Sequence, residues 1–240
     1  MKISKIVTYD LLAALRSWFT YFSLILCILP AGAIAYSVAN FEAPFDTTQL
    51  IAFFAFFGSL LVVINAMLPF TKDLSQNTII LMMNQSSNRM KYFLSKIISI
   101  GCSGLLFGLA CLASTYVLSN YAALDFDSAL YWKIPVTYVI YTLFYGALFL
   151  LISIYFTNVA ALFIIALISI VLLPSLFNGL LFWDKIPDSV VKFLENSLPL
   201  YYLPDLLNTL EWQTSFYFSS IVAILLFTVL GMLLIRRKDY

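Results

Sequence analysis

Two groups of side chains in this 240-residue sequence have types and spacing that suggest a function. The first is a polar stretch, residues 71–96, which encloses the apolar run Ile79-Ile80-Leu81-Met82-Met83. The second is a set of tyrosines, Tyr138, Tyr141 and Tyr145, at positions i, i+3 and i+7 of an apolar segment. This spacing puts the three hydroxyls on one helical face, and such hydroxyls need partners when buried. They therefore face either protein or a cavity.

Several kinds of catalytic site are excluded by what the sequence lacks. It contains no histidine, which rules out Ser-His-Asp, Cys-His and His-metal sites. It also lacks the pattern G-x-x-x-x-G-K-[ST], so the chain is not expected to bind ATP through a P-loop. Cys27, Cys102 and Cys111 all fall in apolar runs and are interpreted as packing residues. We expect no catalytic residue, no metal site and no cofactor in this chain, which is therefore not expected to be an enzyme.

The composition is that of a membrane protein. Hydrophobic residues make up 62% of the chain, charged residues 10%, and the mean hydropathy is +0.97. Soluble domains contain about 45–50% apolar and about 25% charged residues. The bilayer is the solvent that suits this excess of apolar surface. The net charge of +1 gives no indication of a nucleic-acid partner.

Six apolar segments are long enough to cross a bilayer, which takes about 20 residues. They cover residues 19–39, 50–70, 97–119, 134–156, 159–181 and 216–235. None contains Asp, Glu, Lys or Arg, which disfavours a proton-coupled carrier. Only Thr157 and Asn158 separate the fourth segment from the fifth, which predicts a tight helical hairpin. The predicted fold is all-α, a polytopic membrane protein with one transmembrane domain over residues 1–240.

The distribution of basic residues predicts the orientation. With the N-terminus inside, ten of the 13 Lys and Arg residues fall in cytoplasmic segments and the other three in outer loops. An excess of Lys and Arg marks the cytoplasmic side, so both termini are expected there. The tryptophans agree, because each lies within a few residues of a predicted helix end: Trp18, Trp132, Trp183 and Trp212.

Three segments outside the spans are predicted to be structured. Residues 1–17 carry apolar side chains at helical spacing, flanked by Lys2, Lys5, Asp10 and Arg16, which is typical of an amphipathic helix in the membrane interface. The inner loop, residues 71–96, is the second. The third is the outer segment 182–213, with short helices predicted at Asp188–Asn196 and Pro204–Leu210. The apolar stretch between those two helices, residues 197–202, is expected to dip back toward the membrane.

Smaller features allow two interpretations each. Gly104 and Gly108 form a G-x-x-x-G pair, which permits close helix packing either within the chain or between subunits. The run from Phe53 to Phe57 could line an apolar path or face lipid. Polar residues near prolines mark expected kinks; these pairs are Asn65 with Pro69 and Asn178 with Pro174.

The arrangement resembles the type-2 ABC exporter permeases, and the inner loop carries the closest likeness. The family pattern there is an acidic residue, Gly-Thr, a Leu-rich stretch, a Pro-x-x-Arg turn, then Tyr and Lys before the third span. The matching residues are Asp73, Thr78, Leu81, Arg89, Tyr92 and Lys96. Asn77 replaces the usual glycine, and Ser86 replaces the proline. Leu198-Pro199-Leu200-Tyr201-Tyr202 and Arg236-Arg237-Lys238-Asp239 also resemble segments of the family.

The resemblance implies specific roles for these segments. Residues 1–17 would be an elbow helix, residues 73–84 a cytoplasmic coupling helix that docks on a separate ABC ATPase subunit, and residues 182–213 re-entrant helices before the last span. ATP and Mg²⁺ would be bound by that partner. The residues expected to couple to the ATPase are Asp73, Asn77, Thr78, Ile80, Leu81, Met82, Asn84, Arg89 and Lys96. The residues expected along the translocation path are Phe53, Phe56, Phe57, Asn65, Tyr138, Tyr141, Tyr145 and Asn178.

The expected function is that of a permease subunit in a bacterial cytoplasmic membrane, paired with a second copy or a sister permease. It would export a hydrophobic or amphipathic substrate, for which the resemblance suggests a peptide. The short loops are similar to those of the peptide-exporter branch, which includes permeases for phenol-soluble modulins and for lantibiotic self-protection. Two other classes remain open. One is a stand-alone channel, lipid scramblase or assembly scaffold; the other, disfavoured by the missing histidine, is an intramembrane enzyme.

Overall fold

The computed structural model describes residues 2–76, 86–181 and 187–237, and every regular element in these ranges is a helix. Six helices among the described residues are long and apolar enough to cross a membrane, which confirms the predicted all-α, membrane-spanning class. The helices are α1 (Ile3–Leu15), α2 (Trp18–Phe41), α3 (Thr47–Ser75), α5 (Ser86–Tyr121), α6 (Leu130–Ser153), α7 (Val159–Leu167), η1 (Ile168–Leu172), α8 (Leu173–Leu181), α9 (Asp188–Ser197), α10 (Pro199–Thr209) and α11 (Thr214–Arg237).

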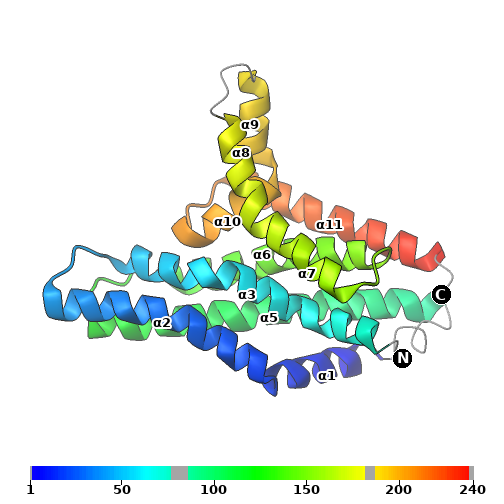
Figure 1. The fold of residues 1–240 in the computed structure, drawn as a ribbon, viewed down its shortest axis with the longest axis horizontal. Coiled ribbons are helices and arrows are strands. Elements are labelled where there is room, and N and C mark those ends of the chain that lie inside the picture. Colours follow the sequence, from blue (N-terminus) through cyan, green and yellow to red (C-terminus); the bar gives the residue numbers. More distant parts are fainter. Residues whose placement is uncertain (1, 77–85, 182–186, 238–240) are drawn as a thin grey trace.

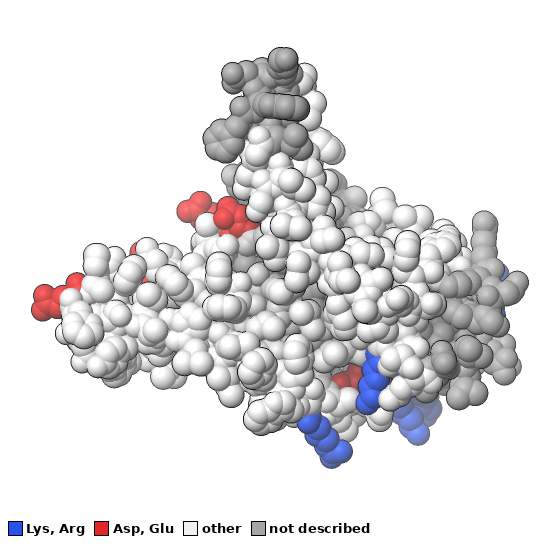
Figure 2. Space-filling view, in the orientation of Figure 1, with Lys and Arg blue, Asp and Glu red and all other residues white. Residues whose placement is uncertain are grey.

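Helices α2, α3, α5, α6 and α11 run roughly along the long axis of the molecule and form its bundle (Figure 1). The two chain termini lie at the same end of this bundle. We call this the terminal end and the other the distal end. Helix α1 lies against α5 and α3 near the terminal end. Figure 2 shows Lys and Arg atoms near α1 with an acidic patch beside them, and further Asp and Glu atoms at the distal end and beside α10.

Much of the predicted inner loop, residues 71–96, belongs to the two flanking helices in the structure. Helix α3 continues to Ser75 and α5 begins at Ser86, so most of residues 71–96 is helical. The predicted spans 50–70 and 97–119 were drawn from hydropathy, which marks where a helix meets lipid, not where its hydrogen bonding ends. No proline or glycine interrupts residues 86–96, and the helix continues through polar residues.

The fifth predicted span is helical throughout Val159–Leu181, but it is not straight. Asn158 caps its start, since its Oδ1 accepts hydrogen bonds from the N–H groups of Ala160 and Ala161. A π-helical segment, η1, precedes Pro174, whose ring cannot donate the usual i to i−4 bond. Beyond this point α8 points away from the bundle together with α9 (Figure 1), so the kink expected near Pro174 is present.

The segment before the last helix differs in one respect from the prediction. Helix α9 matches the first short helix, but the second, α10, begins at Pro199 rather than Pro204. Residues 199–202, expected to link the two helices, form the first turn of α10 instead. Pro199 occupies the first helical position, where a missing N–H costs nothing. Leu203, Leu206 and Leu207 then bury one face of α10 in the main core.

Close packing of α5 on α6 depends on two glycines. A Cβ atom added at Gly104 would lie 2.9 Å from the carbonyl oxygen of Tyr138, and one at Gly108 would lie 2.9 Å from the Cα of Pro135. Both neighbours are backbone atoms, which cannot move aside as a flexible side chain can. The G-x-x-x-G pair therefore serves packing within this chain, one of the two interpretations left open by the sequence.

Candidate functional site

A polar stripe on α5 forms one wall of the candidate site. Tyr92, Lys96 and Ser99 lie at i, i+4 and i+7, so they share one helical face. This face is turned into the protein: Tyr92, Lys96 and Ser99 are each 1% exposed. Lysine is almost never fully buried without a partner. The neighbouring helices must therefore supply negative charge.

Two aspartates from different helices surround the Lys96 ammonium. Its Nζ lies 3.0 Å from both carboxylate oxygens of Asp10 on α1, and 2.8 Å from Oδ2 of Asp73 on α3. It also donates to the carbonyl oxygen of Pro69 at 3.2 Å. An ammonium has three protons to donate, and these contacts use all of them. We call Asp10, Asp73 and Lys96 the ion cluster.

Hydroxyl groups on α5 complete the ion cluster. The Tyr92 hydroxyl donates to Asp73 Oδ2 at 2.8 Å. The Ser99 hydroxyl lies 2.9 Å from Asp10 Oδ2 and equally close to the Ser95 carbonyl, either of which can accept its proton. Buried charges are tolerated when such hydrogen bonds accompany the ion pair.

The electrostatic balance at Asp10 favours the neutral acid more than usual. Burial raises the pKa of the Asp10 carboxyl above its ordinary value of 3.8, and the negative charge of Asp73 adds to the rise. The Lys96 ammonium acts in the opposite direction without cancelling the effect of burial. With both aspartates ionised the ion cluster has a net charge of −1. This geometry suits a joint between helices, because removing one member leaves the others unbalanced.

The ion cluster connects α1 to the last turns of α3 and the first turns of α5. Two of its members, Asp73 and Lys96, are among the residues expected to couple to an ATPase. Their side chains face each other inside the protein, with 14% and 2% of the side chain exposed. They are therefore placed to hold helices together rather than to present charge at the surface.

The other residues expected to couple are placed only in part. The Arg89 guanidinium lies at the start of α5, 3.5 Å from the carbonyl oxygen of Arg236 near the end of α11. The remaining six lie outside the described residues: Asn77, Thr78, Ile80, Leu81, Met82 and Asn84. Their coupling role stays a prediction.

A cleft of about 980 Å³ opens between α3, α8 and α10, toward the distal side. Of the residues expected along a path, Phe56, Phe57 and Asn178 line it. The Asn178 Oδ1 accepts a hydrogen bond of 2.9 Å from the hydroxyl of Tyr201 across the cleft, which joins α8 to α10. Three carboxylates also line this cleft: Glu195, Asp205 and Glu211.

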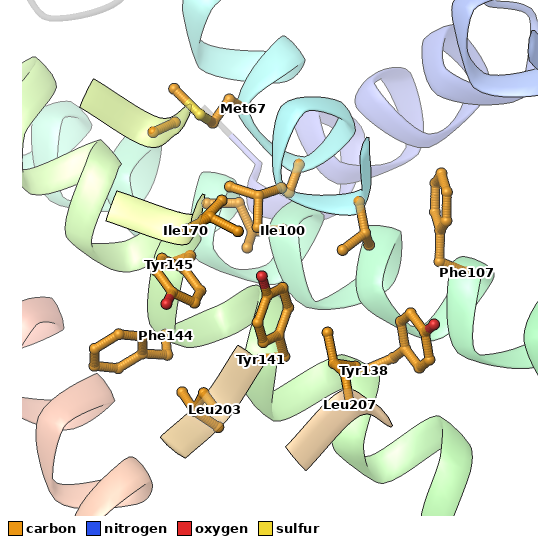
Figure 3. Packing of buried hydrophobic residues seen from close by; sticks show 14 of the residues in the cluster. Met67, Ile100, Phe107, Tyr138, Tyr141, Phe144, Tyr145, Ile170, Leu203 and Leu207 are labelled. Atoms are coloured by element: carbon orange, nitrogen blue, oxygen red, sulfur yellow. The ribbon is translucent and has the colours of Figure 1, made fainter. Parts of the chain in front are cut away.

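The tyrosines on α6 do not line this cleft. Tyr138, Tyr141 and Tyr145 are fully buried in the core, where Figure 3 shows them among Ile100, Leu203 and Leu207. Tyr141 donates to the carbonyl oxygen of Ser59 at 3.1 Å. The hydroxyls of Tyr138 and Tyr145 have no hydrogen-bond partner among the described residues. In this conformation the three side chains face protein, one of the two expectations from the sequence.

Two further path residues have separate surroundings. Asn65 is 4% exposed and joins α3 to α2, because it accepts from Thr20 at 2.9 Å and donates to Ser23 at 3.0 Å. Phe53 is 39% exposed on the bundle surface, whereas Phe54 beside it is fully buried. The aromatic run therefore divides between core and surface as the helix turns.

The role of Asp10 was not predicted from the sequence. Asp10 was expected among the polar flanks of an amphipathic helix, yet it is buried in α1 at 6% exposure. The signal was present, because Asp10 follows Ile3 and Val7 and precedes Ala14 at spacings of three and four. A carboxylate in that stripe indicates a buried partner.

The described residues contain no cluster of three or more side chains suited to hold a metal ion. In the ion cluster the Lys96 ammonium uses all its protons, and the two carboxylates also accept from Tyr92 and Ser99. The chemistry of the ion cluster is that of a structural joint between three helices. No protein-family model matches the chain, and no curated protein was found that matches it.

Proposed function

We propose that this chain is the membrane-spanning permease subunit of an ATP-driven exporter in a bacterial cytoplasmic membrane. Both termini would lie in the cytoplasm, and a separate ABC ATPase subunit would supply the energy. The permease would act with a second copy or a sister permease. Its substrate would be hydrophobic or amphipathic, for which a peptide is the leading candidate.

The observation that carries the proposal is the position of the ion cluster relative to the cleft. Asp73 in the ion cluster and Phe57 in the cleft belong to the same helix, α3. They are 16 residues apart, a rise of roughly 24 Å along a helix. A displacement of the terminal end of α3 would therefore be transmitted to the cleft.

The ion cluster would link two parts of the molecule on which an ATPase could impose such a displacement. Helix α1 and the connection after α3 are the segments that an ATPase partner would contact under this proposal. Lys96 holds α1 and the last turn of α3 to α5 through Asp10 and Asp73. Movement imposed on either segment would then be shared by α3 and α5, rather than absorbed locally.

The proposal is tested by mutating the apolar run in the connection between α3 and α5. The triple variant Ile80→Asp, Leu81→Asp and Met82→Asp removes the apolar surface expected to dock on the ATPase. We expect co-purification with the ATPase from a neighbouring reading frame to fall by about tenfold or more, since hot-spot residues typically contribute about 2 kcal/mol or more. Affinity purification followed by quantitative immunoblotting measures this change.

The matched control keeps the apolar character at the same positions: Ile80→Leu, Leu81→Ile and Met82→Leu. This variant should retain the ATPase. Normal recovery of the ATPase with the aspartate variant would contradict the coupling assignment. A chain that never associates with an ATPase would instead favour a stand-alone channel, scramblase or scaffold.

A further inference from the structure

Another cavity lies at the terminal end, beside the ion cluster, and is lined in part by Asp10 and Asp73. It is a groove of about 740 Å³ between α1, the last turns of α3 and the start of α7. Its apolar wall includes Leu12 and Leu68, with Val159 and Phe163 on α7. This wall offers contact to a hydrocarbon chain.

Basic side chains stand at two edges of this groove. Arg16 is the C-cap residue that follows α1, and Lys72 lies in the last turn of α3. Both side chains line the groove. Neither the guanidinium nor the ammonium has a carboxylate partner among the described residues. The carboxylates that also reach the groove, Asp10 and Asp73, are already bound to Lys96. The ion cluster has a net charge of −1 and Arg16 with Lys72 contribute +2, so the charge around the groove is positive.

The residues next to the groove are of the kinds found at a membrane surface. Trp18 follows Arg16 by two residues and is 79% exposed, and tryptophan is enriched at the headgroup level of bilayers. Lys72 comes directly after the apolar part of α3. Figure 2 shows Lys and Arg atoms on this side of the molecule, near α1, with an acidic patch beside them.

We propose that this groove binds an anionic phospholipid, with its phosphate between Arg16 and Lys72 and an acyl chain along Leu12, Leu68 and Phe163. Bound there, the lipid bridges α1 and α3 beside the ion cluster and helps to hold α1 in place. The site is independent of the proposed export function, since any membrane protein with this groove would offer it.

The test compares lipids of opposite headgroup charge on the intact, detergent-purified protein. Phosphatidylglycerol and phosphatidylcholine with identical acyl chains are titrated in, and bound lipid is counted by native mass spectrometry. The wild type should prefer phosphatidylglycerol. Each basic side chain near an anionic surface contributes about fivefold, so the Arg16→Gln, Lys72→Gln double variant should lose roughly 25-fold of this preference.

Two controls separate the groove from general attraction to basic surfaces. Lys5→Gln removes an exposed charge on the same helix, α1, and Lys133→Gln with Lys192→Gln removes two charges elsewhere; both should keep the preference. Equal binding of the two lipids by the wild type, or full retention by the double variant, would overturn the proposal. An equal loss in the Lys5→Gln control would overturn it too. A double variant that keeps its lipid but loses a protein partner would show that the groove belongs to that partner.

Discussion

Lys96 faces two carboxylates from two different helices, and its removal would leave both of them buried without a cation. We expect Lys96→Met to destabilise the protein by about 3–5 kcal/mol, the usual cost of breaking a buried ion pair from one side. Asp10→Asn should cost less, because burial already favours the neutral form of this side chain. Thermal unfolding in detergent, followed by tryptophan fluorescence, measures both.

A matched double variant checks the origin of this loss. Combining Asp10→Asn with Lys96→Met removes one negative charge together with the positive one, and should recover part of the stability lost in Lys96→Met. If Lys96→Met unfolds at the wild-type temperature, or if Asp10→Asn is the more harmful change, the ion cluster is not the joint described above.

The dependence of stability on pH gives a second test of Asp10. Its pKa is raised in the folded protein, so the folded state binds a proton more readily than the unfolded chain. The contribution of Asp10 is therefore fully present below pH 3.8 and is lost as pH rises through the raised pKa. The difference in melting temperature between wild type and Asp10→Asn should fall with rising pH in that window.

Asp46 provides a control of opposite sign. Hydrogen bonds from the Thr48 side chain and from the N–H groups of Thr48 and Gln49 lower the pKa of this N-cap carboxylate. Its contribution is therefore present above pH 3.8 and is lost as pH falls through the lowered pKa. For Asp46→Asn, the melting temperature of the wild type minus that of the variant should rise with pH. If the same difference for Asp10→Asn also rises with pH, the buried position of Asp10 is contradicted.

At this scale the sequence predicted residue types better than contacts. Asp73 and Lys96 were singled out for a coupling role that stays a prediction, and their pairing with Asp10 depends on how α1 packs against α5. A lysine just before an apolar segment is normally interpreted as a membrane-surface anchor. The structure buries it because two carboxylates from distant parts of the chain reach it.

At the scale of helices, the close contact between α5 and α6 can be tested by adding a side chain to its two glycines. Gly104→Ala and Gly108→Ala place a Cβ within 2.9 Å of backbone atoms on α6, so the helices must separate. We expect each to lower stability by about 1–3 kcal/mol, the typical cost of overpacking. The change in melting temperature in detergent measures the effect.

Gly32 on α2 is the matched control, because a Cβ there meets nothing within 4 Å. Gly32→Ala should be neutral or stabilising by up to about 1 kcal/mol, since alanine favours helix more than glycine does. Equal losses in all three variants would show that the α5–α6 contact does not determine the result.

The helices themselves were largely predictable, and their ends were not. Hydropathy located all six apolar segments, and the Thr157-Asn158 hairpin appears where it was expected. It could not reveal that α3 and α5 continue beyond the apolar region. The start of α10 was misplaced because two prolines, Pro199 and Pro204, each suit a first helical turn. Burial of Leu203 and its neighbours in the core decides in favour of the earlier one.

At the scale of the whole molecule, the ion cluster and the cleft lie at separate places along α3. The cleft combines apolar residues such as Phe57 with carboxylates, a surface that suits an amphipathic substrate under the proposed function. Composition predicted the membrane setting, because a chain that is 62% hydrophobic exposes more apolar surface than water accommodates. The position of the cleft depends on how α8 and α10 pack, which no local pattern in the sequence encodes.

The central claim is that the ion cluster transmits motion from the terminal end to this cleft. The direct measurement is the labelling rate of Phe57→Cys by a water-soluble maleimide, in the proposed complex with an ATPase and on a Cys102→Ala background. Cys27 and Cys111 are fully buried and should not react. We predict that ATP with vanadate changes this rate severalfold, and that Lys96→Met abolishes the change in a complex that still assembles. An unchanged response to nucleotide in Lys96→Met, or no response in the parent complex, would contradict the account.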